Sequence, residues 1–333
     1  MDKGEVETDV SQVKAAADRL TENIGRVIVG KKEVIELVLV ALLCEGHLLI
    51  EDVPGIGKTM LAKATAKSLG GSFRRIQFTP DLLPSDVTGI HYFNQKTSEF
   101  QFRPGPIIAN IVLADEINRA TPRTQSCLLE CMQEQQITVD EETVPLPRPF
   151  LVMATQNPIE LEGTFPLPEA QLDRFLLRVK LGYPTEGEEG AILTRFQQEN
   201  PLDALFSVVE AAELLELQRL CRQVYVEDSV RNYVIAITRA TRNHQDIELG
   251  ASPRASLSLY LAAQSLAAIR GRNYVIPDDV KYLAIPTLAH RLIARTEARL
   301  RGGSVESIVR EIISNVPVPV EGTTYQTDKI KEG

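Results

Sequence analysis

The sequence predicts a doubly wound parallel α/β domain followed by a smaller all-α domain. Short apolar runs alternate with helical patterns through the first 183 residues. These runs are continuously apolar, which is typical of strands that a parallel sheet buries on both faces. After Tyr183-Pro184 only helical spacings continue. We therefore expect an α/β domain at 1–183, a helical domain at 184–316 and, because it is short and polar, a loosely held tail at 317–333.

Each expected element follows from its residue pattern. Five apolar runs predict the strands of the sheet, at 47–52, 73–78, 111–115, 150–155 and 175–181. Helical spacing places helices beside them at 11–29, 31–44, 58–71 and 121–135. Two segments alternate around polar turns and predict β-hairpin inserts, at 91–102 and 135–147. The second domain should contain helices near 186–199, 210–222, 227–244, 253–270, 277–291 and 303–315.

Composition and charge limit the partners of the chain. The net charge is −9, so the average surface field repels nucleic acid, which we expect to be an unlikely partner. The longest apolar run, Val34 to Cys44, is interrupted by Glu36 and is shorter than the roughly 20 residues of a membrane span. The N-terminus is acidic and polar and shows no secretory signal, so a cytoplasmic location is expected without membrane insertion.

The four cysteines do not predict a metal or redox site. They stand at 44, 127, 131 and 221, without a C-x-x-C pair or a nearby histidine cluster. Cys127 and Cys131 are four residues apart on an expected helix, a spacing that also suits a redox pair. The interpretation that we favour is that they are reduced, buried small side chains.

The segment EDVPGIGKTM (51–60) predicts a phosphate-binding loop. It follows an expected strand and precedes an expected helix, which is the context that such a loop requires. Its glycines allow backbone N–H groups to face phosphates, Lys58 can reach the β and γ phosphates, and the hydroxyl of Thr59 can ligate Mg²⁺. Asp52 occupies the place of the first glycine in the general pattern G-x-x-x-x-G-K-[ST]. Its carboxylate could weaken nucleotide binding by repulsion between like charges.

Polar side chains follow two other expected strands. Asp115 and Glu116 end the run IVLADE, where one carboxylate can hold hydrated Mg²⁺ and the other can activate water. Asn157 follows FLVMATQ, where it can orient the attacking water, although an asparagine before proline is also an ordinary turn residue. Alone, each is a weak signal; together with the phosphate loop they indicate nucleotide hydrolysis.

These three strand ends, in this order, resemble those of the AAA+ ATPases, with Walker A at 54–59, Walker B at 111–116 and sensor 1 at Asn157. The resemblance extends to IVGKKEVIE (28–36), LPEAQLDRF (167–175) and GASPRASLSL (250–259). It is most specific for the MoxR branch, on EDVPGIGKT, LADEINRATPRTQSCLLECMQE and ATQNPIELEGTFPLPEAQLDRF. Loops of this branch often carry a larger residue where Asp52 stands.

The resemblance implies the following site residues. It gives nucleotide contacts to Val29, Gly30, Pro54, Gly55, Ile56, Gly57, Lys58, Thr59 and Met60. Arg174 would be an arginine finger that reaches the nucleotide of a neighbouring subunit. Arg254 would be sensor 2, contacting the γ phosphate from the helical lid. For both arginines an ordinary surface ion pair is the alternative. The two hairpin inserts would face the pore of a ring.

The resemblance also implies an activity and partners. The implied activity is ATP hydrolysis with Mg²⁺. The chain is expected to assemble into a ring, with a hexamer as the predicted form, and to remodel or activate other proteins as a chaperone does. Metalloenzymes are candidate clients, and a protein with a von Willebrand factor A domain is a candidate partner. The alternatives are a chelatase-type motor subunit, a DNA or RNA motor, and a nucleotide-controlled switch that hardly hydrolyses ATP.

Overall fold

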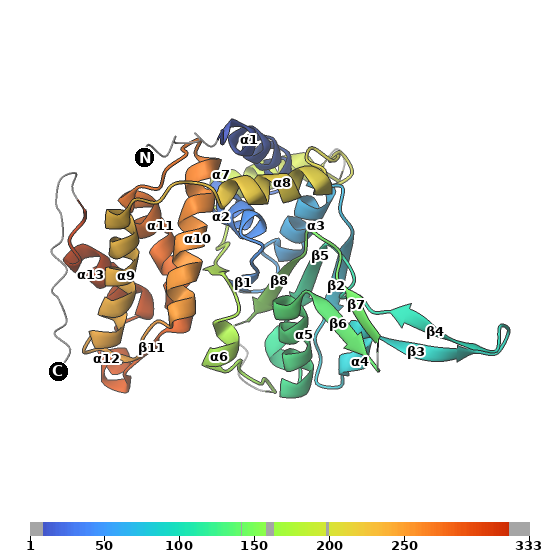
Figure 1. Ribbon diagram of the computed structural model, residues 1–333. Coiled ribbons are helices and arrows are strands. Elements are labelled where there is room, and N and C mark those ends of the chain that lie inside the picture. The colour runs from blue at the N-terminus through green and yellow to red at the C-terminus, as the bar shows by residue number, and fades with distance from the viewer. Residues whose placement is uncertain (1–8, 141, 158–162, 198–199, 320–333) are drawn as a thin grey trace, which may run out of the picture.

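A computed structural model describes residues 9–140, 142–157, 163–197 and 200–319. Five strands form one parallel sheet in the order β2-β5-β8-β1-β9. Their bounds are β1 Leu48–Glu51, β2 Phe73–Gln77, β5 Ile111–Asp115, β8 Leu151–Gln156 and β9 Leu177–Val179. The predicted parallel sheet is confirmed (Figure 1).

Alternate residues of the strands enter two separate hydrophobic cores. Along β1, Leu48 and Ile50 belong to one core and Leu49 to the other. The first core contains α1 (Ser11–Gly25), α2 (Lys32–Leu43) and α3 (Lys58–Ser68), and the second contains α5 (Pro122–Glu134). The central strands β1, β5 and β8 are buried along nearly their whole length, so they read as continuous apolar runs, whereas most residues of the edge strand β2 are exposed.

Strand β9 is shorter than the predicted segment 175–181. Phe175 and Leu176 are buried, and their apolar character extended the predicted strand. The ladder with β1 covers only 177–179, and three residues later the chain turns at Gly182, which has φ +65°. Burial alone therefore does not mark the end of this strand. A short helix, α6 (Glu169–Leu172), precedes it.

Both predicted hairpins are present. One is β3 (Gly89–Asn94) with β4 (Glu99–Pro104), preceded by the short helix α4 (Pro84–Thr88); the other is β6 (Gln136–Val139) with β7 (Glu142–Pro145). The β3–β4 hairpin extends far from the sheet (Figure 1). Its side chains Phe93 and Phe100 are 51% and 74% exposed and contact each other edge to face, with ring centroids 5.4 Å apart. This hairpin thus presents aromatic surface to the solvent.

The second part of the chain is mainly helical. Its elements are α7 (Glu186–Phe196), α8 (Ala211–Cys221), α9 (Asp228–Asn243), α10 (Pro253–Ile269), α11 (Pro277–Leu288), α12 (Thr296–Leu300) and α13 (Val305–Asn315). The all-α expectation omitted a small antiparallel pair, β10 (Ile247–Leu249) with β11 (Ile293–Ala294), whose few residues are too short to show alternation. Short 3₁₀ turns at Ile117–Arg119 and Ala289–Arg291 complete the elements. Most of the predicted tail, 320–333, lies outside the described residues.

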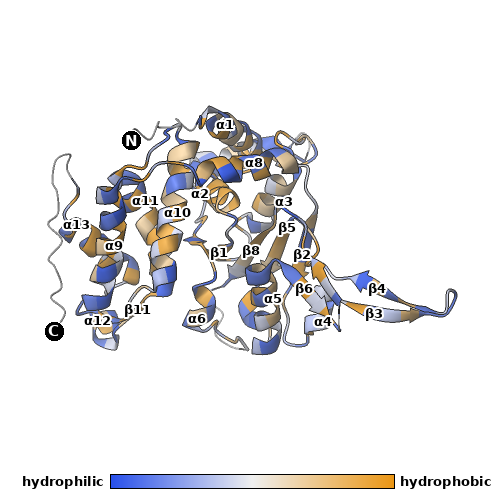
Figure 2. Cartoon of the chain, in the orientation of Figure 1, coloured by the Kyte–Doolittle hydropathy of each residue, from blue (hydrophilic) through white to orange (hydrophobic). Residues whose placement is uncertain are grey.

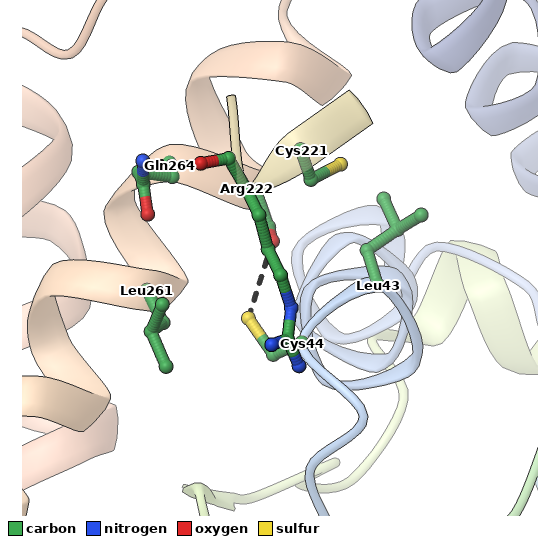
Figure 3. A pocket seen from close by; sticks show the side chains of 7 residues that line it. Leu43, Cys44, Cys221, Arg222, Leu261 and Gln264 are labelled. Atoms are coloured by element: carbon green, nitrogen blue, oxygen red, sulfur yellow. Dashed lines mark hydrogen bonds between the residues drawn. The ribbon is translucent and has the colours of Figure 1, made fainter. Parts of the chain in front are cut away.

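Helix α2 joins the two parts. It is coloured largely as hydrophobic in Figure 2 and packs against α1, α8 and α10. At this junction Cys44 and Cys221 line a cavity of about 10 Å³ (Figure 3). Burial raises the pKa of each of these thiols to about 12, so both remain protonated at neutral pH. All four cysteines are free; Cys131 is buried as predicted, whereas Cys127 is only partly buried.

Candidate active site

The phosphate loop connects β1 to α3. Gly55 and Gly57 have φ of +85° and +97°, a left-handed conformation that glycine adopts without strain. Gly57 is the N-cap residue of α3, and within the described structure no side chain caps this helix. The N–H groups of the first helical turn, which includes Thr59, are therefore available to an anion at the positive end of the helix.

Lys58 lies among the acidic residues of the neighbouring strand ends. Its Nζ donates to the main-chain oxygen of Asp52 at 2.5 Å. Burial lowers the pKa of Lys58, while the charges of Asp115, Asp52 and Glu116 act in the opposite direction. The phosphate loop and the end of β5 thus meet at the carboxyl edge of the sheet, as the sequence predicted.

Asp115 and Glu116 are held by the side chains of adjacent strands. Thr155 Oγ1 donates to Asp115 Oδ1 at 2.6 Å and accepts from the Glu116 N–H at 2.8 Å. Arg75 Nη2 donates to Asp115 Oδ2 at 2.6 Å, and Gln77 donates to Glu116 Oε2 at 2.8 Å. Glu116 itself has φ +57°, in the left-handed region.

Sequence reasoning missed Thr155, Arg75 and Gln77. Thr155 is only 1% exposed on strand β8, and a polar residue inside an otherwise apolar run was the available signal. Arg75 and Gln77 are two residues apart on β2, which pairs with β5, so their side chains lie on the same face of the sheet. This pairing could not be seen without the strand order.

The oxygen donors at this edge fit Mg²⁺. Asp115 offers a carboxylate and Thr59 a hydroxyl, which are the hard donors that this ion prefers. Among the described residues there is no group of three or more His, Cys, Asp or Glu side chains that could hold a metal by itself. Mg²⁺ commonly binds through one or two protein ligands together with phosphates and water. Asn157 directly follows β8 and is 8% exposed.

A cavity of about 440 Å³ adjoins the phosphate loop. Of the predicted contacts, it is lined by Val29, Pro54, Gly55, Ile56, Gly57 and Met60. Further lining residues that the sequence did not single out are Val27, Ile28, Lys31, Leu181, Gly182, Tyr183, Pro184, Glu189, Ile192 and Phe196. The mainly apolar lining suits a planar base.

Gly30 lies next to this cavity. It has φ +75°, and a Cβ atom there would lie 1.7 Å from Oε1 of Glu188. The Glu188 side chain could move away from such a Cβ atom, so the positive φ is the main reason that this position favours glycine. Lys31 then donates to the main-chain oxygen of Tyr183 at 3.0 Å, which ties the N-terminal segment to the chain that leads into α7.

Arg174 and Arg254 line a second cavity of about 200 Å³. Its lining includes Gly46 and His47, which precede β1, so it lies at the amino edge of the parallel sheet, opposite the phosphate loop. Arg174 Nη1 donates to the main-chain oxygen of Leu129 at 2.9 Å. Arg254 was expected to contact the γ phosphate from the helical lid. Within a single chain it lies with Arg174 instead, and it is not among the residues that line the phosphate-loop cavity.

Asp173 holds the segment that carries Arg254 close to Arg174. It accepts from the hydroxyl of Ser252, the N-cap residue of α10, at 3.1 Å, and pairs with the buried Arg291 at 2.8 Å. Both contacts bind the helical part to the segment before β9. The first turn of α10, and Arg254 with it, is thereby fixed at the amino edge of the sheet.

Comparison with known proteins gives the family of the chain. Residues 47–177 match the model of the ATPase family associated with various cellular activities (AAA), and residues 239–312 match the AAA lid domain. The chain is 43% identical to Chaperone MoxR1 of Mycobacterium tuberculosis, over 91% of this chain and 82% of that protein. It belongs to the MoxR family of AAA+ ATPases.

Other relatives of this MoxR family member include one without an assigned role. The Uncharacterized protein YeaC of Bacillus subtilis is 54% identical over 91% of this chain and 95% of that protein. A crystal structure of a proposed ATPase from Cytophaga hutchinsonii superposes with a TM-score of 0.86 and 38% identity, covering 93% of this chain and 97% of that one. In the part of the chain that the structure describes, no helix is long and apolar enough to span a membrane.

Proposed function

We propose that this MoxR family member hydrolyses ATP to ADP and phosphate in the presence of Mg²⁺. The observation that carries the proposal is the meeting of Lys58, Asp115 and Glu116 at one sheet edge, beside a cavity that is large enough for a base. A bound Mg²⁺ would neutralise charge on the phosphates, with Asp115 and Thr59 as its protein ligands. This donor set supports binding without a dedicated all-protein metal cage.

The roles of the remaining groups follow from their positions. Lys58 and the N–H groups of the first turn of α3 would bind the phosphates. Glu116, held through its N–H by Thr155, would accept a proton from or orient the attacking water. Asn157, at the end of the next strand, would fix that water from the other side. The residues of the 440 Å³ cavity would hold the base.

We further propose that Arg174 and Arg254 act on the nucleotide of a neighbouring subunit. Their position at the edge of the sheet opposite the phosphate loop supports this, because neither lines the cavity beside the loop of its own chain. An arginine supplied by a neighbour stabilises the transition state only in the assembled ring. Hydrolysis would then depend on oligomerisation, with a hexamer as the proposed ring.

The energy of hydrolysis would drive chaperone-like remodelling or activation of partner proteins. The relative named Chaperone MoxR1 supports this role, and the exposed Phe93 and Phe100 on the β3–β4 hairpin supply apolar surface for client contact. A partner with a von Willebrand factor A domain, and metalloenzymes as clients, remain part of this proposal. A cytoplasmic location would be consistent with it.

Glu116→Gln tests the enzymatic proposal. We expect it to keep ATP binding and to lower turnover by two orders of magnitude or more, about what a general base contributes. Lys58→Ala is the matched control, in which binding is lost together with turnover. Equal turnover of wild type and Glu116→Gln would leave only a nucleotide-controlled switch. A large, salt-sensitive stimulation of turnover by single-stranded DNA would favour a nucleic-acid motor instead.

Capture experiments with the same variant address the client. Glu116→Gln holds the ATP state, so clients should remain attached during affinity purification in ATP and be released in ADP. Partners of a metal-chelatase complex would favour the chelatase-type motor. Recovery of no protein in either nucleotide would contradict the remodelling role.

A further inference from the structure

Asp52 stands where the general phosphate-loop pattern has glycine, one residue beyond the end of β1. Its N–H donates to the main-chain oxygen of Gln156 at 3.2 Å, which continues the pairing of β1 with β8. The carboxylate makes two more bonds: Oδ1 accepts from the Val53 N–H at 2.9 Å, and Oδ2 accepts from the Gly182 N–H at 2.7 Å. Both carboxylate oxygens are thus bonded to main-chain donors.

The bond to Gly182 reaches a wall of the base cavity. Gly182 lies 130 residues further along the chain, where φ of +65° turns the backbone after β9. The segment 181–184 lines the cavity together with the phosphate loop. Lys31 also bonds to this segment, by donating to the main-chain oxygen of Tyr183. The carboxylate of Asp52 therefore joins the start of the phosphate loop directly to this wall.

The negative charge of Asp52 is stabilised by nearby groups of its own chain. Two N–H dipoles point at its carboxylate, and its main-chain oxygen accepts from Lys58. Asp52 is also one of the charges that favour the protonated form of Lys58 against burial. A glycine at this position would supply the same main chain but no link to Gly182.

We propose that Asp52 is a positioning residue for the base of the nucleotide, because its carboxylate holds the wall 181–184 in place against the phosphate loop. The inference rests on the proposed function, since it presumes that the loop and the cavity hold one nucleotide. Its consequence is selective: loss of the carboxylate should affect ligands that carry a base and spare ligands that consist of phosphates alone.

The test compares ADP with inorganic tripolyphosphate, titrated calorimetrically into wild type, Asp52→Ala and Asp52→Asn. For Asp52→Ala we expect the ADP dissociation constant to rise about tenfold, as for loss of a hydrogen bond to a charged group, with that of tripolyphosphate unchanged. Asp52→Asn keeps one oxygen acceptor, so its loss for ADP should be about threefold. Thermal unfolding of each variant verifies the fold; where Asp52→Ala does not fold, the Asp52→Asn values decide.

Each other outcome has a distinct meaning. Unchanged ADP affinity in a folded Asp52→Ala protein would overturn the proposal. Equal weakening of ADP and tripolyphosphate would overturn it too, since Asp52 would then act on the phosphate loop. Tighter binding of both ligands in both variants would show that Asp52 acts by charge repulsion. If wild type binds neither ligand, the proposed function itself fails, whatever the variants do.

Discussion

Replacement of Thr155 by valine is predicted to separate the fold of the site from its chemistry. Valine keeps the shape and volume of the side chain but lacks the hydroxyl, which is buried in the wild type. The change removes two hydrogen bonds, one of 2.6 Å to Asp115 Oδ1 and one of 2.8 Å from the Glu116 N–H. No cavity is created, so the effect reports on these two bonds.

The magnitude follows from what each bond does. A buried hydrogen bond to a charged group contributes about 2 kcal/mol, and Asp115 keeps its bonds to Arg75, so we expect stability to fall by about 2 kcal/mol. Glu116 has φ +57°, and its N–H would lose the acceptor that holds this backbone conformation. A misplacement of a catalytic group by about 1 Å can lower turnover roughly 100-fold, so we expect kcat to fall roughly 10- to 100-fold.

The assay measures kcat, KM for ATP and the ADP dissociation constant of wild type, Thr155→Val and Thr155→Ser. Serine retains the hydroxyl and should keep kcat within a few-fold of wild type. The nucleotide loop is untouched, so ADP affinity should change little in either variant. A folded Thr155→Val protein with wild-type kcat would refute the reasoning that Thr155 positions Glu116.

Two further predictions concern titratable side chains away from the phosphate loop. His47 accepts from the Val152 N–H at Nδ1, and burial lowers its pKa from 6.5 to about 4. Its protonation therefore favours the unfolded chain. As the pH falls from 6.5 toward 4, the free energy of unfolding, measured by urea titration, should decrease by about 3 kcal/mol. His47→Gln should not show this decrease. The second prediction is that iodoacetamide at pH 8 modifies Cys127 well before Cys44, because a hydrogen bond with the Cys131 thiol lowers the pKa of Cys127 and burial raises that of Cys44. Mass spectrometry that shows the reverse order of modification would contradict it.

The sequence predicted those parts of the site that depend on local pattern and on strand ends. The phosphate loop needs only a strand, glycines and a helix, all contiguous at 48–68. Asp115 and Glu116 were predicted to lie near the loop because the carboxyl ends of parallel strands share one edge of a sheet. Their proximity to Lys58 agrees with that reasoning.

What the sequence did not predict depends on packing between distant segments. The bond from Asp52 to Gly182 joins residues 130 apart, and neither residue type indicates its partner. The position of Arg254 is set by the contacts of Asp173 with Ser252 and Arg291, which require the helical part to be docked against the sheet. No periodicity in a single segment carries this information.

If a neighbouring subunit completes the hydrolytic site, as we propose, two inactive variants should restore ATP turnover when they are mixed. Lys58→Ala removes the lysine that we propose binds the phosphates and Arg174→Ala removes the proposed arginine finger, so each should be inactive alone. In rings assembled from equal amounts of both, about a quarter of the interfaces would pair an intact phosphate loop with an intact arginine. We predict that ATP turnover returns to a comparable fraction of the wild-type rate. Mixed assemblies as inactive as either variant alone would contradict the claim.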